Sequence, residues 1–198
     1  MPQAFLFDIG NVIIAFDFSK AAARLEPYCK MEACEALEIV SGLTPALETG
    51  HISPDEFIAE ASTMIGYSGS PEFFREAFED IFVLNEPMVR FIEQQKAAGK
   101  DLFLLSNTNG IHVPFFEATY PVFDLFDGRI YSHEVGVMKP DPDIYTISIE
   151  KLRLNPNCTI YVDDVRQNCE AGEKAGFFTI WYQPSDHASF LESASRYL

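Results

Sequence analysis

Polar side chains of the types that bind metal ions and phosphate groups follow three short apolar runs in this chain. The runs occupy positions 4–7, 102–105 and 159–162, and the residues that follow them are Asp8, Ser106 with Asn107, and Asp163 with Asp164. A short, continuous apolar run is typical of a strand that is buried on both faces of a parallel sheet. Because parallel strands end at one edge of the sheet, where ligands of open α/β sheets bind, we expect these polar residues to meet there.

Carboxylates that meet at one edge repel each other unless a cation lies between them. The acids concerned are Asp8, Asp163 and Asp164, and the chain has no cysteine or histidine pairs spaced as zinc ligands. Oxygen ligands without thiolate or imidazole favour a hard ion, and Mg²⁺ fits this set best. The sequence therefore predicts a magnesium site.

The same region offers groups that bind a phosphoryl group. Ser106 has a hydroxyl, the turn after it has backbone N–H groups, and Lys139 supplies a positive charge in front of Pro140. A metal ion, a lysine and backbone donors around one aspartate would stabilise a phosphoryl group during transfer. Asp8 could then act as the nucleophile and form an aspartyl-phosphate.

Each of these residues also has a purely structural interpretation. Asp8 could cap a turn, and Lys139 could be one solvated lysine among several. The pairs Ser106–Asn107 and Asp163–Asp164 could form a turn and a helix cap. The order and spacing of all four groups together favour the chemical interpretation.

These four segments resemble the four motifs of the haloacid dehalogenase superfamily, and the resemblance extends over nearly the whole chain. In chain order they read Asp8-Ile9-Gly10-Asn11-Val12, Ser106-Asn107-Thr108, Lys139-Pro140-Asp141-Pro142, and Asp163-Asp164 with Asn168 after them. Together with residues 48–53 (ETGHIS), they look most like sugar phosphatases of the α-D-glucose-1-phosphate phosphatase type. They are also similar to the phosphatase domain of soluble epoxide hydrolase.

The resemblance implies a magnesium-dependent phosphatase that hydrolyses a small phosphorylated metabolite, such as a sugar phosphate, through an aspartyl-phosphate on Asp8. Asp8 would be both nucleophile and metal ligand, and Lys139 would be the second catalytic residue. Asp164 would also bind the metal, and Asp163 would lie beside the metal or hold Lys139. The Gly10 carbonyl is implied as a further metal ligand. The residues implied to bind the substrate are Gly10, Asn11, Ser106 and Asn107.

Gly10 departs from the pattern of the superfamily. Most of its phosphatases carry a second aspartate two residues after the nucleophile as general acid and base, and this chain has a glycine there. We therefore expect either a preference for activated leaving groups or a replacement group, for which Asp17 and His51 are the nearest candidates in the sequence. Two alternatives stay open: a metal-free hydrolase of the dehalogenase kind, and a non-catalytic relative that binds a phosphorylated ligand.

The elements that position these residues change character along the chain. Residues 17–82 are predicted to form helix after helix without a strand, and from residue 84 onward strands and helices alternate. This alternation predicts an α/β fold with a doubly wound, Rossmann-like parallel sheet. We predict a core domain of residues 1–16 and 84–198, with an all-helical cap domain of residues 17–83 inserted over the carboxyl edge of the sheet.

Prolines and glycines predict the boundaries of the helices in the cap. Pro27 is expected to separate two helices, and Pro45 is expected to open another short helix, which Gly50 ends. Ser53 and Glu56 have the spacing of a capping box at the start of the next helix.

Composition limits the class of protein. The chain has 198 residues, of which 47% are hydrophobic, and this suits one domain, or one domain with an insertion, around a sizeable core. The net charge of −16 argues against binding to nucleic acid or to an anionic membrane. The N-terminus does not read as a secretion signal, no apolar run is as long as a membrane span, and the cysteines form no CxxC pair. We expect a cytoplasmic protein whose partner is a small phosphorylated metabolite, and the oligomeric state stays open.

Overall fold

The centre of the fold is a parallel sheet. The structure is a computed structural model that describes residues 3–197. Within that range, five strands pair in the order β5-β4-β1-β6-β7, and all neighbours are parallel. These strands are β1 (Ala4–Phe7), β4 (Asp101–Ser106), β5 (Gly128–Tyr131), β6 (Thr159–Asp163) and β7 (Phe178–Trp181). The doubly wound α/β fold predicted from the sequence is confirmed.

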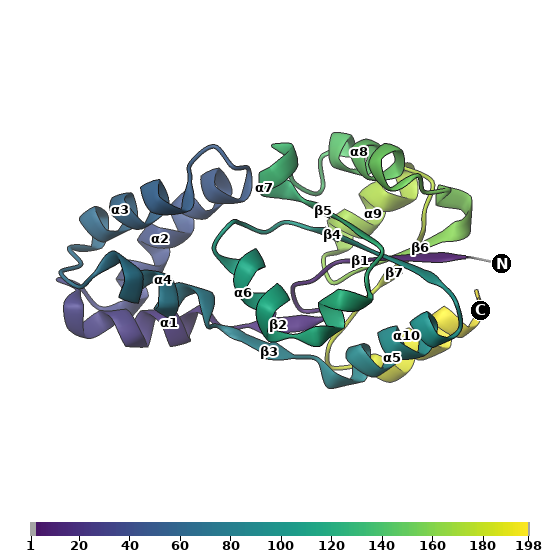
Figure 1. The fold of residues 1–198 in the computed structure, drawn as a ribbon, viewed down its shortest axis with the longest axis horizontal. Helices are drawn as coiled ribbons and strands as arrows, with labels where there is room; N and C mark the ends of the chain where they lie inside the picture. The colour runs from purple at the N-terminus through teal and green to yellow at the C-terminus, as the bar shows by residue number, and fades with distance from the viewer. Residues whose placement is uncertain (1–2, 198) are drawn as a thin grey trace.

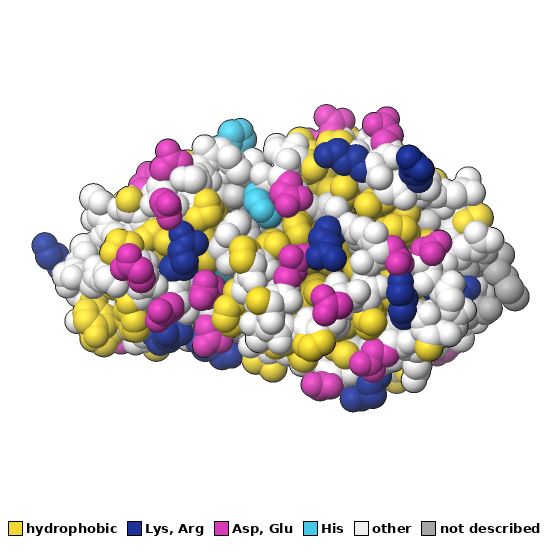
Figure 2. Space-filling model, viewed as in Figure 1, with side chains coloured by type: hydrophobic (Ala, Val, Ile, Leu, Met, Phe, Trp, Pro, Cys, Tyr) yellow, Lys and Arg dark blue, Asp and Glu magenta, His cyan; other side chains and the backbone are white. Residues whose placement is uncertain are grey.

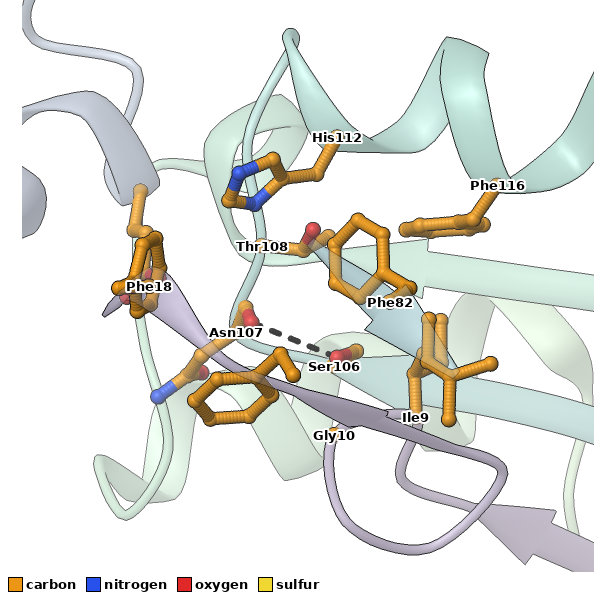
Figure 3. Close-up of a pocket in the computed structure, with 12 residues that line it drawn as sticks. Ile9, Gly10, Phe18, Phe82, Ser106, Asn107, Thr108, His112 and Phe116 are labelled. Atoms are coloured by element: carbon orange, nitrogen blue, oxygen red, sulfur yellow. Dashed lines mark hydrogen bonds between the residues drawn. The ribbon is translucent and has the colours of Figure 1, made fainter. Parts of the chain in front are cut away.

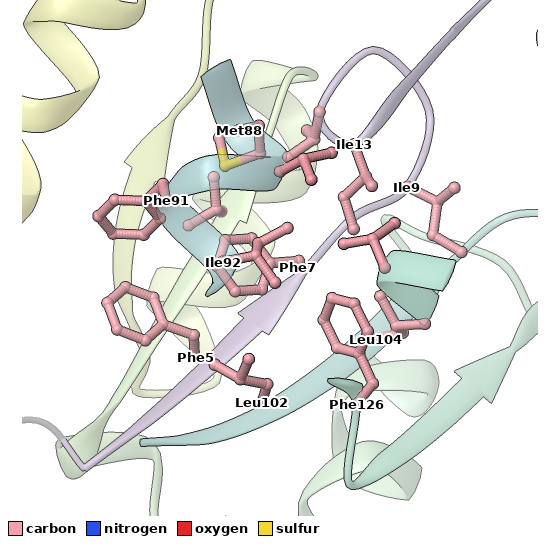
Figure 4. Packing of buried hydrophobic residues seen from close by; sticks show 14 of the residues in the cluster. Phe5, Phe7, Ile9, Ile13, Met88, Phe91, Ile92, Leu102, Leu104 and Phe126 are labelled. Atoms are coloured by element: carbon pink, nitrogen blue, oxygen red, sulfur yellow. The ribbon is translucent and has the colours of Figure 1, made fainter. Parts of the chain in front are cut away.

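Helices cover both faces of this sheet (Figure 1). One face carries α5 (Glu86–Ala97), α6 (His112–Thr119) and α10 (His187–Ser195), and the other carries α8 (Pro142–Leu152) and α9 (Arg166–Lys174). The side chains of β1 alternate between the two faces, as the period of a strand requires. Phe5 and Phe7 pack with Phe91 of α5 (Figure 4), whereas Leu6 belongs to the cluster with Tyr145 of α8.

A helical block lies at the carboxyl end of the strands, to the left in Figure 1. It consists of α1 (Phe18–Leu25), α2 (Ala33–Glu48), α3 (Pro54–Ile65) and α4 (Pro71–Glu79). The block has a hydrophobic cluster of its own, in which Leu47, Phe57 and Phe74 are buried. The capping box predicted at the start of α3 is present, because Ser53 and Glu56 satisfy each other's backbone N–H groups. We refer to α1–α4 as the cap helices.

A two-stranded ribbon joins the cap helices to the sheet. β2 (Ile14–Phe16) and β3 (Phe82–Leu84) pair as antiparallel strands, so the prediction that no strand lies between residues 17 and 82 is wrong at its last residue. Three residues are too few to establish an alternating pattern in the sequence. The ribbon places the two crossings between cap and core side by side.

Helix α2 is longer than predicted. It continues through Pro45 to Glu48, and no new helix begins at the proline. Proline removes one intrahelical hydrogen bond and strains the preceding turn. Val40 and Leu47, on either side of Pro45, are both buried in the cluster of the cap helices, and this packing keeps the helix continuous. Pro27 does separate α1 from α2, in a 3₁₀ turn at Glu26–Tyr28.

Short elements complete the chain. They are the 3₁₀ turns Pro121–Leu125 and Pro156–Cys158 and the short helix α7 (Ser132–Val135).

No helix within residues 3–197 has both the length and the hydrophobicity needed to cross a bilayer. On the face shown in Figure 2, acidic and basic side chains are interspersed, and the basic ones do not gather into a patch.

Candidate active site

Three acids meet at the carboxyl edge of the sheet. β1 pairs with β4 on one side and with β6 on the other, so Asp8 lies between the ends of these two strands. One carboxylate oxygen from each of Asp8, Asp163 and Asp164 lies within 4.8 Å of the others. The chain changes direction across the sheet at β1, and such a switch point is where open α/β sheets bind their ligands.

Lys139 lies among these acids. Its ammonium is 2.8 Å from Oδ1 of Asp8 and 2.7 Å from Oδ2 of Asp163, and it donates a hydrogen bond of 3.0 Å to the carbonyl of Leu105. An ammonium has three protons, and these three contacts use them all. Lys139 is buried, which excludes the interpretation as a solvated lysine.

Burial and charge act in opposite directions on the pKa values of this pair. Burial raises the pKa of the Asp8 carboxyl to about 7, although the ammonium of Lys139 pulls it down. Burial lowers the pKa of Lys139, but the carboxylates of Asp163 and Asp8 outweigh burial and hold it above its ordinary value. Lys139 therefore stays charged and compensates the buried acids.

Asp163 holds other residues in position. Its Oδ2 accepts hydrogen bonds from Lys139 and from the Tyr161 hydroxyl, and its Oδ1 accepts from the backbone N–H of Val165 at 2.8 Å. The Asn168 amide bonds to both oxygens at 3.0 and 3.2 Å. Because protein donors occupy both oxygens of this completely buried carboxylate, its geometry is that of an anchor for Lys139 and for the start of α9.

Asp164 is more open than Asp163. It is partly exposed, its Oδ2 accepts one hydrogen bond of 3.0 Å from the Asn11 amide, and burial raises its pKa. Asn11 has a positive φ of 53°, which turns the chain after β1 so that its amide reaches Asp164. The carboxylates of Asp8 and Asp164 are two oxygen ligands that lie close together, and this donor set fits Mg²⁺.

The end of β4 is fixed to the segment that carries Lys139. The Asn107 side chain donates to the carbonyl of Lys139 at 3.0 Å and accepts from its backbone N–H at 2.8 Å. The Ser106 hydroxyl contacts the Asn107 carbonyl at 3.4 Å. The Asn107 side chain is thus committed to positioning Lys139, and the backbone of this turn, together with the Ser106 hydroxyl, is what remains for a phosphoryl group.

A cavity of about 100 Å³ adjoins this cluster, between the cap helices and the sheet (Figure 3). Gly10, Ser106 and Asn107 line it on the side of the acids. Most of the other lining residues are apolar and come from the core and from the segments that lead into and out of the cap: Ile9, Ile14, Phe16, Phe18, Phe82 and Phe116. The remaining lining residues are Thr108, His112 and Glu48.

The structure separates the candidates for a replacement acid. Asp17 is exposed and caps α1 through Ser19, and His51 is exposed and bonds to Thr49 through its Nδ1. Neither residue is among those that line the cavity, so the structure does not place these two sequence candidates in its wall. Glu48, in the last turn of α2, does line it. In the sequence Glu48 is one acid among many on an acidic helical segment. Its position is marked by the glycine that ends the helix and by the segment 48–53, which carries part of the family resemblance.

Comparison with known proteins gives the family. The model of the haloacid dehalogenase-like hydrolases matches residues 2–176. A D-ribitol-5-phosphate phosphatase of Bacteroides thetaiotaomicron is 28% identical over 202 residues, which cover 97% of this chain and 96% of the relative. A sesquiterpene phosphatase of Aspergillus oryzae is 26% identical over 181 residues, which cover 88% and 86%. Both relatives are phosphatases, in agreement with the predicted phosphoric monoester hydrolase.

A solved structure agrees with the fold. The crystal structure of a haloacid dehalogenase family enzyme of Bacteroides thetaiotaomicron, in complex with magnesium and inorganic phosphate, superposes with a TM-score of 0.84 at 24% identity. The superposition covers 96% of this chain and 99% of that one. The narrower resemblance to the glucose-1-phosphate phosphatase type stays a prediction. From the matched family model and the fold, the chain belongs to the haloacid dehalogenase-like hydrolases.

Proposed function

We propose that this protein is a magnesium-dependent phosphatase that hydrolyses a small phosphorylated metabolite through an aspartyl-phosphate on Asp8. The observation that carries the proposal is the position of the Asp8 carboxylate, which is buried at a strand end, 2.8 Å from the ammonium of Lys139 and clustered with Asp164. The carboxylate and the cation beside it are already held in position by the fold. The carboxylate can therefore attack a phosphoryl group without a cost for ordering these two side chains.

The chain's own residues have distinct roles in the proposed reaction. One oxygen of Asp8 attacks phosphorus, and the Ser106 hydroxyl and the backbone of Asn107 donate to the charged phosphoryl oxygens. The charge of Lys139 stabilises the same oxygens electrostatically while its protons stay on Asp8, Asp163 and the Leu105 carbonyl. Asp163 keeps Lys139 in place through the 2.7 Å contact. Mg²⁺, bound by Asp8, Asp164 and the Gly10 carbonyl, would neutralise charge on the transferring group. Asn11 supports this set by holding Asp164.

For the substrate we propose a sugar phosphate or a related polyol phosphate. The cavity of about 100 Å³ admits only a small leaving group next to the acids. Ser106 and Asn107 line it on the side of the phosphoryl site, and its aromatic rings can contact the C–H faces of a sugar. A relative that spans most of the chain is, by its name, a D-ribitol-5-phosphate phosphatase. The proposed compartment is the cytoplasm, in keeping with the free thiols of Cys29, Cys34, Cys158 and Cys169.

A metal-free hydrolase of the dehalogenase kind is the second candidate. It needs the Asp8 nucleophile but no further carboxylate pointing at the reacting group. Asp164, which is partly exposed beside Asp8, has no role in such a reaction, and the cluster of acids favours the phosphatase.

The test is Asp8→Asn, which keeps the shape of the side chain and removes the nucleophile. With Mg²⁺ and a panel of phosphorylated metabolites, we expect the wild type to release phosphate and the variant to lose about 10⁴-fold or more in turnover. Circular dichroism and thermal unfolding should show an intact fold. A folded variant that keeps more than about a tenth of the wild-type rate would contradict the assignment of Asp8.

A further inference from the structure

Hydrolysis of a phosphate ester requires a proton at two points. The leaving oxygen takes up a proton when the ester bond breaks, and the water that hydrolyses the aspartyl-phosphate must lose one. A positioned acid or base typically contributes about 10²–10⁴-fold to such steps. The group that supplies and removes the proton must lie in the cavity where the leaving group departs.

Gly10 supplies no such group, because it has no side chain, and the Phe16 ring lies close beside it. A Cβ built on Gly10 would lie 3.0 Å from the ring edge of Phe16. A side chain at this position would need the Phe16 ring to shift slightly, and in this chain, which has none there, the proton must come from another wall of the cavity.

Only two titratable side chains line the cavity among the described residues, His112 and Glu48. His112 is unsuited to proton transfer, because its Nδ1 bonds to the Asn109 amide at 3.0 Å and its Nε2 contacts the carbonyl of Phe78 at 3.1 Å. Burial also lowers the pKa of His112 to about 4, so the ring is neutral and serves as a structural link between α6 and α4. This leaves Glu48.

Resting on the phosphatase function proposed above, we propose that Glu48 of the cap helix α2 is the general acid and base of this enzyme and takes over the role for which Gly10 has no side chain. Glu48 lines the same cavity as Gly10, Ser106 and Asn107, on the wall that the cap contributes. Its carboxyl has no hydrogen-bond or ion-pair partner within residues 3–197, so it is available to a substrate.

The surroundings of Glu48 suit both roles. Burial raises the pKa of its carboxyl to about 7, although the charge of the Lys139 ammonium pulls it down. Helices α1 and α3, which pack on α2, contribute no titratable side chain to the described cavity lining. α7 meets the end of α2 through the backbone carbonyl of His133, next to Gly50. A carboxyl with such a pKa is present in both protonation states near neutral pH, as an acid that later acts as a base must be.

The proposed steps balance. In the first, an Asp8 oxygen forms a bond to phosphorus, the bond from phosphorus to the ester oxygen breaks, and that oxygen takes the proton of Glu48 and leaves as the alcohol. In the second, water attacks phosphorus while the Glu48 carboxylate accepts a proton from it. The bond to Asp8 breaks, its electron pair returns to the Asp8 carboxylate, phosphate leaves, and Glu48 is protonated again.

The experiment compares two esters in Glu48→Gln. One is an ester of an unactivated alcohol that the wild type hydrolyses, with D-ribitol 5-phosphate tried first, and the other is p-nitrophenyl phosphate, whose leaving group needs no proton. Glu38→Gln, an exposed glutamate on the same helix, is the matched control. Asp8→Asn is the control for the nucleophile.

We expect Glu48→Gln to lose about 10²–10⁴-fold in turnover of the alcohol ester. With p-nitrophenyl phosphate it should release about one equivalent of nitrophenol in a fast burst and then turn over slowly, because the aspartyl-phosphate forms but lacks a base for its hydrolysis. Acid quenching should trap this phosphoenzyme. Glu38→Gln should behave as the wild type, and Asp8→Asn should show no burst.

Two results would overturn the role of Glu48. One is a Glu48→Gln variant with wild-type turnover of the alcohol ester. The other is an equal loss on both esters without a burst, which would mean that Glu48 binds substrate or supports structure. If instead the wild type releases no phosphate, or Asp8→Asn shows the burst, the phosphatase function itself fails, and the two failures are therefore distinguishable.

Discussion

At the scale of single residues, burial of Glu48 makes the stability of the protein depend on pH. Because burial raises the pKa of this carboxyl from 4.5 to about 7, the folded state binds more protons than the unfolded chain between these values. The free energy of unfolding therefore falls as the pH rises through this window. Glu48→Gln removes the titration without changing the shape. In metal-free buffer we expect equal stability of wild type and variant near pH 4, and a variant more stable by about 1–3 kcal/mol near pH 8. Urea unfolding at both pH values measures the difference, with Glu38→Gln as the control. A difference that does not change with pH would show that Glu48 does not titrate in this range.

At the scale of elements, the end of α2 is fixed against the core by a glycine. Gly50 has a φ of +68°, and a Cβ there would overlap the backbone carbonyl of His133, which cannot move without α7. Gly42 lies inside the same helix, and a Cβ there would meet nothing within 4 Å. We expect Gly42→Ala to raise the free energy of unfolding by about 0.5–1 kcal/mol, because alanine favours the helix. Gly50→Ala should lower it by more than about 1 kcal/mol, and should also reduce turnover because it displaces the helix end that carries Glu48. Thermal unfolding and steady-state kinetics on both variants test this pair. Full activity of Gly50→Ala would mean that the docking of α2 on α7 does not position the site.

At the scale of the whole molecule, the fold gathers three acids around one lysine, and this excess of negative charge is what a divalent cation would relieve. If Asp8 and Asp164 bind Mg²⁺, the ion binds the folded state alone, and at about 100 times its dissociation constant it should add roughly 2.7 kcal/mol to the free energy of unfolding. Asp164→Ala should remove this stabilisation and the activity together, whereas Asp124→Ala, at an exposed position away from the cluster, should change neither. Thermal unfolding with and without Mg²⁺ measures the first effect, and phosphate release in excess chelator measures the second. Full activity in chelator would favour the metal-free hydrolase.

The sequence by itself determined the sheet and its polar edge. Short apolar runs that end in Asp8, Ser106 and Asp163 indicated buried strands, and their alternation with helices after residue 84 indicated a parallel sheet. The α/β fold predicted in this way is confirmed. The family also followed, because its motifs lie within single segments. The roles of the individual site residues stay predictions.

Tertiary structure alone decided which cap residue reaches the site. Asp17 is close to the first motif along the chain, and His51 is close to the end of α2, yet both side chains are exposed. The position of the cap depends on the ribbon of β2 and β3 and on the continuous helix α2. That ribbon is too short to leave a pattern, and the continuity of α2 through Pro45 depends on the packing of Val40 and Leu47. The raised pKa of Glu48 is equally a tertiary property. It arises from the burial of one carboxyl between two parts of the chain, and burial of that kind is a consequence of packing that no local run of residues encodes.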